Sequence, residues 1–192
     1  MSVTDKKQLR EHFRQIRMAT DHDREQLVLD EMIAERFTKS EAYLSCEKLL
    51  IYISGEIEVG TSSIIEDAFS KGKTVLVPRC VKGTNIMEFF RINSFDDLDT
   101  GSYGILEPDE KCEKYDGFDN SVCVVPGLSF DLRGYRLGFG KGFYDRFLTE
   151  HDITAIGLCY ENCISETLPA ENHDVSVDCI VTQDRVIPVK KG

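Results

Sequence analysis

The stretch KLLIYISGEIEVGTSSIIEDAFSKGKTVLVP, residues 48–78, decides the fold class. It begins and ends with short, nearly continuous apolar runs, at residues 48–54 and 74–78, as buried parallel strands do. The segment between them, SSIIEDAFSKG at residues 62–72, is typical of a helix that Thr61 could cap and that ends at Gly72. The stretch therefore predicts a strand–helix–strand unit with parallel strands and a right-handed crossover.

Outward from this unit, the chain continues to alternate helical and strand patterns. Helices are expected at residues 4–19, with Thr4 as N-cap, at 21–43 and at 142–151. Strands are expected at residues 86–92, 121–126, 153–160, 178–182 and 185–189, and a loop region of low periodicity at 93–120. The pattern predicts a single α/β domain over residues 1–192. We expect a mostly parallel, twisted sheet flanked by helices in three Rossmann-like layers, with an N-terminal helical segment.

Composition and charge narrow the class of protein. With 192 residues, 41% hydrophobic and 30% charged, the chain is typical of a globular protein. Its apolar runs are too short to span a bilayer, and its polar N-terminus lacks a signal-peptide core, so we expect a soluble, cytoplasmic monomer with no membrane partner. The net charge of -11 argues against a nucleic-acid partner. None of the seven cysteines shows CxxC spacing, which favours free thiols over a zinc site.

The first predicted helix carries an apolar face and a cationic stripe. Its apolar residues Leu9, Phe13 and Ile16 recur at helical spacing and are candidates for the core. The stripe consists of Lys6, Arg10, Arg14 and Arg17. For a generic helix such a stripe is a solvated surface.

The glycine-rich segment RLGFGKGFYD, residues 136–145, follows the predicted strand at 121–126 and opens a helix. Ligands of open α/β sheets bind at the carboxyl ends of the strands, where glycine amides and a helix N-terminus can approach a phosphate. Arg136 and Lys141 add positive charge, and Asp145 could hold a magnesium ion. The segment matches neither a Walker A loop nor GxGxxG, so a tight structural turn is the alternative to an anion cradle.

Residues 125–148, VPGLSFDLRGYRLGFGKGFYDRFL, closely resemble the signature of 5-formyltetrahydrofolate cyclo-ligases, also called methenyltetrahydrofolate synthetases. Three further motifs of that family occur here in the same order. They are K-x-x-x-R at Lys6 and Arg10, E-x-x-T at Glu58 and Thr61, and D-x-x-V-D within HDVSVD, residues 173–178. The chain departs from the family pattern at Phe143, where the family more often has tyrosine, so any hydrogen bond from that hydroxyl is lost.

This resemblance implies an ATP- and Mg²⁺-dependent conversion of 5-formyltetrahydrofolate to 5,10-methenyltetrahydrofolate with release of ADP and phosphate. It implies ATP phosphates bound by the first helix and the glycine-rich segment, at Lys6, Lys7, Gln8, Leu9, Arg10, Arg136, Leu137, Gly138, Phe139, Gly140, Lys141, Gly142, Phe143 and Tyr144. It places the reduced folate at Ile53, Glu58, Phe139, Gly140, Lys141, Gly142 and Phe143. It also implies catalytic roles for Lys141, Arg136 and Tyr144, and Mg²⁺ ligation by Asp145 and Asp178.

Other interpretations of the same residues stay open. Glu58 could be a solvated loop carboxylate, Asp178 could cap a turn, and Tyr144 could simply pack. The whole protein could bind folate or a nucleotide without turnover, although retention of folate would need no phosphate cradle. It could also act on a sugar phosphate or thioester, because α/β scaffolds host many chemistries. That reaction would leave the Glu58-x-x-Thr61 element without a role.

Overall fold

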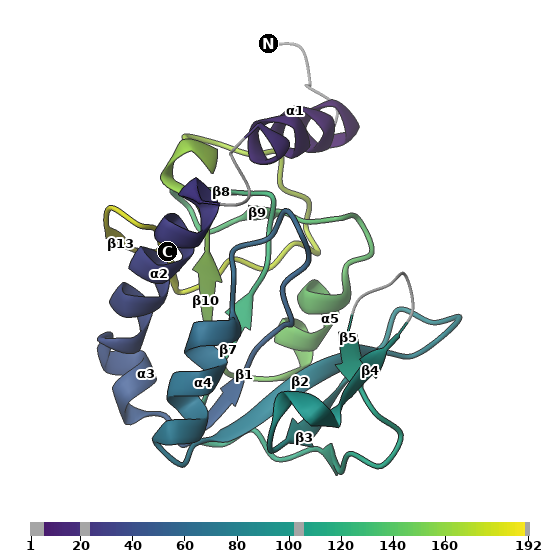
Figure 1. Ribbon diagram of the computed structural model, residues 1–192. Helices are drawn as coiled ribbons and strands as arrows, with labels where there is room; N and C mark the ends of the chain where they lie inside the picture. The colour runs from purple at the N-terminus through teal and green to yellow at the C-terminus, as the bar shows by residue number, and fades with distance from the viewer. Residues whose placement is uncertain (1–5, 20–23, 102–105, 191–192) are drawn as a thin grey trace.

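The computed structural model describes residues 6–19, 24–101 and 106–190 and is built around one large sheet (Figure 1). This sheet has eight strands in the order β13-β12-β10-β7-β1-β2-β3-β6. Its strands are β1 (Lys48–Leu50), β2 (Thr74–Cys80), β3 (Met87–Ile92), β6 (Lys114–Tyr115), β7 (Ser121–Val125), β10 (Thr154–Leu158), β12 (Cys179–Val181) and β13 (Val186–Pro188). The helices are α1 (Lys6–Met18), α2 (Glu25–Thr38), α3 (Glu41–Ser45), α4 (Ser62–Ser70) and α5 (Phe143–Glu150).

The unit β1–α4–β2 confirms the expected parallel strand–helix–strand arrangement, with Lys48 paired to Thr74 and Leu50 to Leu76. Thr61 stands at the N-cap position of α4, but its hydroxyl donates to the Tyr52 carbonyl oxygen (2.8 Å) and makes no cap bond. The expected side-chain cap at Thr61 is therefore wrong. Gly72 follows the end of the helix with a left-handed φ of 68°, the conformation that favours glycine there.

The sheet is mostly parallel, as expected, because β12, β10, β7, β1 and β2 all run in one direction. The antiparallel strands stand toward its edges: β13 pairs with β12, and β3 pairs with β2 and β6. The expected continuous helix at 21–43 is wrong, since the described part divides into α2 and α3, with Ser40 accepting from the Tyr43 amide (3.3 Å) as the N-cap of α3. Thr4 and residues 20–23 lie outside the described ranges.

Short strands occur where the sequence suggested a loop. Between residues 93 and 120 the chain forms β4 (Leu98–Thr100), β5 (Leu106–Pro108) and β6, with β4 paired to β5. After β7, a small sheet unites β8 (Ser129–Asp131), β9 (Arg136–Leu137) and β11 (Ile164–Ser165). The hairpin of β8 and β9 carries the chain from the end of β7 into the glycine-rich segment.

The order of the central strands creates a switch point beside β1. The chain leaves β1 for β2 on one side, whereas β7, on the other side of β1, leads to β10 farther out. Right-handed crossovers then place α4 and α5 on opposite faces of the sheet, with α2 against α4 and α5 against β3 (Figure 1). The loops after β1 and β7 separate at this point, where open α/β sheets bind their ligands. Helix α1 crosses this carboxyl end of the parallel strands (Figure 1).

All seven cysteines are free thiols, as expected. Within residues 6–19, 24–101 and 106–190, no group of three or more histidine, cysteine or acidic side chains is arranged to hold a metal ion. Across the same residues, no helix has both the length and the apolar character needed to cross a membrane.

Close packing under β10 predicts that Gly157→Ala destabilises the fold. A Cβ at Gly157 would lie 2.6 Å from Cζ of the fully buried Phe130, inside van der Waals contact. Overpacking of this kind costs about 1–3 kcal/mol of unfolding free energy. Urea denaturation should show the loss, whereas Gly117→Ala, whose Cβ meets only the Tyr115 ring at 3.8 Å, should unfold as the wild type does. Equal midpoints for both variants would contradict this account of the core.

Candidate active site

The glycine-rich segment joins β9 to α5 through two left-handed residues. Gly140 has a φ of 94° and Gly142 a φ of 67°, so both positions favour glycine on conformational grounds. Gly138 is different, because a Cβ there would meet nothing within 4 Å. The internal packing of the chain therefore does not require glycine at 138, and the bare backbone leaves room beside the segment. Helix α5 begins directly afterwards at Phe143, and no side chain caps its first amides, which are left free of intrahelical partners.

Helix α1 reaches this segment through Arg10. The Arg10 Nε donates to the carbonyl oxygen of Gly138 (2.8 Å), and its Cζ would lie 3.3 Å from a Cβ at Gly140. This contact brings together two elements that the sequence implicated separately. Lys7 and Gln8 are exposed, and Leu9 packs against the core.

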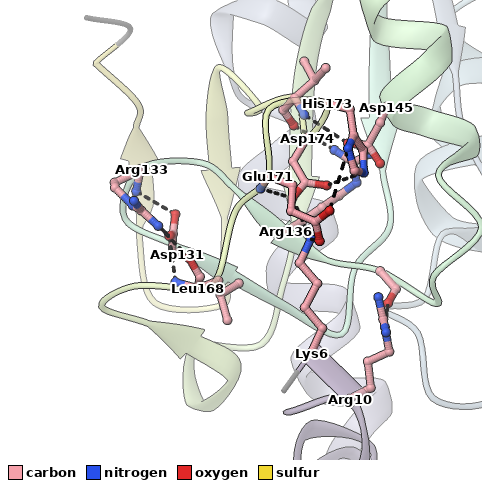
Figure 2. Close-up of polar contacts among 12 residues, drawn as sticks. Lys6, Arg10, Asp131, Arg133, Arg136, Asp145, Leu168, Glu171, His173 and Asp174 are labelled. Atoms are coloured by element: carbon pink, nitrogen blue, oxygen red, sulfur yellow. Dashed lines mark hydrogen bonds and ion pairs between the residues drawn. The ribbon is translucent and has the colours of Figure 1, made fainter. Parts of the chain in front are cut away.

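Lys6, at the start of α1, is bound by two carboxylates of the 171–178 segment (Figure 2). Its Nζ lies 2.7 Å from Asp174 Oδ2 and 2.9 Å from Glu171 Oε1. Burial lowers the pKa of Lys6, but the bonds to the two carboxylates outweigh it and leave the pKa raised. Lys6 is therefore a fully charged ammonium, poised beside an acidic loop.

Arg136 and Asp145 form a closed set of contacts with the main chain of Val175 (Figure 2). Arg136 Nη2 lies 2.8 Å from Asp145 Oδ1, and Arg136 Nη1 donates to the Val175 carbonyl oxygen (2.9 Å). The Val175 amide in turn donates to Asp145 Oδ1 (3.0 Å). These bonds tie the start of α5, strand β9 and the 171–178 segment into one wall.

Asp145 and Asp178, the two expected metal ligands, border different cavities. Asp145 lines a cavity of about 480 Å³ with Lys141, Arg146 and His173. Asp178 lines a neighbouring cavity at the far end of α5, and its Oδ2 accepts from the Ala155 amide (2.8 Å). The described structure thus does not place these two carboxylates around a common centre.

Lys141 and Tyr144 differ sharply in environment. Lys141 is exposed at the rim of the larger cavity, and no ion pair holds it within the described residues. The Tyr144 hydroxyl is buried, and it finds no hydrogen-bond partner in the described part of the chain. Burial raises the pKa of Tyr144 well above its usual value, and the charges of Glu58 and Arg136 both act on it. Phe143 packs against the core beside it, and Phe139 is 46% exposed.

The β1–α4 loop, residues 51–61, presents Ile53 and Glu58 at the end of the neighbouring strand. Both side chains are half-buried, and Glu58 Oε2 accepts from the Gly55 amide (2.8 Å). Burial raises the pKa of Glu58, while the Gly55 amide and the charge of Arg17 oppose that rise. A half-buried carboxylate with a fixed orientation does not fit a freely solvated loop residue.

The sequence analysis gave Arg17 no role in the site. Arg17 is nevertheless the most buried cation of the expected stripe, 2% exposed, whereas Arg14 is exposed. Its guanidinium donates to the carbonyl oxygens of Ile57 (2.7 Å), Gly127 (2.6 Å) and Leu128 (3.1 Å). A sequence signal existed, because Arg17 lies four residues after Phe13 and so on the buried face of α1. The stripe is thus not a surface face: Lys6, Arg10 and Arg17 all turn toward the protein.

Comparison with known proteins shows the family to which the chain is related. A sequence model of the 5-formyltetrahydrofolate cyclo-ligase family matches residues 2–183. The probable 5-formyltetrahydrofolate cyclo-ligase of Caenorhabditis elegans is 30% identical over 171 residues, which cover 82% of each chain. The 5-formyltetrahydrofolate cyclo-ligase of Saccharomyces cerevisiae is 34% identical over 151 residues, which are 66% of this chain and 71% of that one.

A solved structure of a related protein has the same fold as this chain. The NMR structure of Aquifex aeolicus 5,10-methenyltetrahydrofolate synthetase superposes with a TM-score of 0.85 at 30% identity. The match covers 97% of this chain and 94% of the Aquifex chain. The match to the family model and the structural superposition both cover nearly the whole sequence. The chain therefore belongs to the 5-formyltetrahydrofolate cyclo-ligase family.

Proposed function

We propose that this protein converts 5-formyltetrahydrofolate to 5,10-methenyltetrahydrofolate and consumes one ATP in doing so, with release of ADP and phosphate. The observation that carries the proposal is the Tyr144 hydroxyl, which is buried beside the cationic segment and has no hydrogen-bond partner among the described residues. Tyr144 belongs to the glycine-rich segment, and its ring centre lies 6.0 Å from Cζ of Arg136. A buried hydroxyl without a partner among the described residues is suited to a bound ligand.

The phosphate half of the site would be built by α1 and the glycine-rich segment. Lys6 and Arg10 already face this region, and Lys141 stands at the cavity rim without a carboxylate partner among the described residues. In our proposal ATP phosphates replace Asp174 and Glu171 as partners of Lys6. Lys141 and the amides at the start of α5 stabilise the charge that develops as the γ-phosphoryl group moves.

The reduced folate would bind against the β1–α4 loop, with Ile53 as an apolar wall. A carboxylate can accept two N–H donors from an aminopyrimidine edge, and we propose that Glu58 does this for the pterin. The fixed Gly55–Glu58 hydrogen bond orients the carboxylate before the ligand arrives. Residues 139–143 would then face both ligands, and Tyr144 would donate its hydrogen bond to the bound substrate.

The chemistry that fits this arrangement has three steps. The formyl oxygen first attacks the γ-phosphorus, and the bond from that phosphorus to the bridging oxygen of ADP breaks. The resulting iminophosphate carbon is a better electrophile than the formyl amide, so the other folate nitrogen attacks it, closes the ring and loses its N–H proton to solvent. The carbon–oxygen bond then breaks, and phosphate leaves with the former formyl oxygen. The protein contributes positioning, neutralisation of charge and exclusion of water.

Magnesium would neutralise phosphate charge when bound, and one carboxylate is enough for such an ion, which usually keeps waters and phosphate oxygens as its other ligands. Asp145 fits this role because it lines the cavity beside Lys141. Asp178 lines the neighbouring cavity and holds the Ala155 amide, so our proposal relies on Asp145 alone. In this proposal, the small-molecule ligands of the protein are ATP and a reduced folate. That the protein is a cytoplasmic monomer stays a prediction.

The proposed reaction requires four components together. Absorbance in the methenyl-folate band should rise only when protein, 5-formyltetrahydrofolate, Mg²⁺ and ATP are all present, and one ADP should form per product. A rise without ATP would contradict the phosphorylation step. Tight folate binding with no rise would favour a folate-binding protein without turnover, and anion binding without ATP consumption would favour another substrate.

Lys141→Ala should lower kcat by about a hundredfold, because one preorganised charge facing the moving phosphoryl group is removed. The methenyl-folate assay measures this, with calorimetry to check that the protein still binds folate. Lys82→Ala is the matched control, since Lys82 is also an exposed lysine but lies in the turn between β2 and β3. Wild-type turnover in Lys141→Ala would remove Lys141 from the mechanism.

Glu58→Gln should raise the KM for 5-formyltetrahydrofolate by about tenfold and leave that for ATP nearly unchanged, because a charged acceptor of two hydrogen bonds becomes neutral. Initial rates with each substrate varied in turn measure the two constants. Glu56→Gln is the control, as Glu56 is an exposed glutamate of the same loop.

The pH dependence gives a second test of Glu58. Because burial raises its pKa, Glu58 gains a proton at a pH above the ordinary glutamate range. The wild-type KM for folate should therefore rise as the pH falls from neutral, and this rise should be absent in Glu58→Gln. An identical profile in both proteins would return Glu58 to a structural role.

A further inference from the structure

We infer that Arg17 is a positioning residue: it fixes the β1–α4 loop against the start of the 126–137 segment and so sets the affinity for the reduced folate. This inference rests on the proposed function and adds a residue that does not itself contact a substrate. Arg17 lies in the last turn of α1, on the buried side of the helix, whereas Lys6 and Arg10 lie in its first two turns.

The buried Arg17 guanidinium is held by main-chain oxygens and, among the described residues, not by a carboxylate. Arg17 is 2% exposed, and its guanidinium forms no ion pair with a carboxylate in the described part of the chain. Its donors go instead to main-chain oxygens of Ile57, Gly127 and Leu128. A guanidinium stays charged in proteins, so its burial requires these hydrogen bonds. The bonds are therefore strong constraints on the three peptide groups.

Those peptide groups belong to two different loops. Ile57 lies in the β1–α4 loop, one residue before Glu58, whereas Gly127 and Leu128 follow β7. Strands β1 and β7 are neighbours at the switch point of the sheet, and their loops would otherwise diverge toward opposite faces. One planar fork of donors thus joins the two loops where the proposed ligands meet.

Tyr160 extends the same constraint to Glu58. The Arg17 guanidinium lies 5.1 Å from the centre of the Tyr160 ring, and the Tyr160 hydroxyl contacts Asp30 Oδ1 (2.7 Å) and the Glu58 carbonyl oxygen (3.3 Å). Asp30 also accepts from the Gly60 amide. The backbone on both sides of Glu58 is therefore held by Arg17 at Ile57 and by Asp30 at Gly60, with Tyr160 between them.

The phosphate half of the site has its own anchors. The glycine-rich segment is held by Arg10 at Gly138 and by the Arg136–Asp145 pair, none of which touches Arg17. A defect at Arg17 should therefore displace Glu58 more than it displaces the phosphate-binding segment. This asymmetry distinguishes positioning of the folate from a general loss of structure.

Arg17→Lys tests the inference, because a lysine keeps the charge but cannot reach three carbonyl oxygens with a planar fork. We expect the KM for 5-formyltetrahydrofolate to rise by about tenfold, with the KM for MgATP changed by less than about twofold. Arg14→Lys is the matched control on the exposed face of the same helix and should behave as the wild type. An unchanged folate KM, or equal losses for both substrates, would overturn the inference.

Tyr160→Phe keeps the test decisive if Arg17→Lys does not fold. It retains the ring beside the guanidinium and removes only the hydroxyl that holds Asp30 and the Glu58 carbonyl oxygen. The folate KM should rise by about threefold with the ATP constant unchanged. Equal effects on both constants, or none on either, would count against the inference.

Hydrogen exchange separates a failure of this inference from a failure of the proposed function. In Arg17→Lys, or in Tyr160→Phe if the lysine variant does not fold, amides at residues 55–60 should exchange about tenfold faster than in the wild type, while those at 138–142 keep their rates. This readout needs no substrate. Were the wild type inactive on folate, selective loss of protection at 55–60 would still support the positioning role. Uniform or absent change would overturn that role, whatever the reaction is.

Discussion

Three main-chain oxygens from two diverging loops converge on one buried guanidinium, and the candidate site depends on this contact. Parallel strands at a switch point send their following loops to opposite faces of the sheet, which opens a crevice but leaves its two walls without a direct connection. Arg17 supplies that connection from α1. The same helix carries Arg10 to Gly138 and Lys6 to Asp174, so it contacts the proposed phosphate half of the site as well as the proposed folate half. A helix at the start of the chain thereby organises residues more than a hundred positions away.

Local charge is compatible with the two anionic ligands of the proposed reaction, although the protein has a net charge of -11. The cations of α1 and of the glycine-rich segment gather at the carboxyl end of the sheet, where the start of α5 adds its partial positive charge. Two of these cations are already neutralised inside the protein: Lys6 by Asp174 and Glu171, and Arg136 by Asp145. In the proposed function, these carboxylates would hold the cations in place until a phosphate binds.

Much of the fold followed from local patterns, and the misses have physical causes. The β1–α4–β2 unit was predictable because each strand is a continuous apolar run and the helix has its own periodicity. The hairpin of β8 and β9 was missed because strands of two or three residues carry no periodic signal. Thr61 fits the pattern of an N-cap, yet its hydroxyl donates to the Tyr52 carbonyl oxygen, a tertiary contact that the local sequence does not encode.

The site was less predictable than the fold. Arg17 was grouped with a surface stripe because its burial depends on carbonyl groups about 40 and 110 residues away. The glycine-rich segment was recognised from its residues and Glu58 from the resemblance, but only the structure showed that Asp145 pairs with Arg136 and that Asp178 borders another cavity.

The central claim of the proposed chemistry is that the two half-sites meet so that the formyl oxygen receives the phosphoryl group. The most direct test uses 5-formyltetrahydrofolate labelled with ¹⁸O in the formyl group, turned over with unlabelled ATP and Mg²⁺ in unlabelled water. Mass spectrometry of the released phosphate should show one ¹⁸O atom per molecule, because the carbon–oxygen bond breaks after the oxygen has bonded to phosphorus. Unlabelled phosphate, with the ¹⁸O recovered in water, would contradict the account and show that ATP hydrolysis drives ring closure by another route.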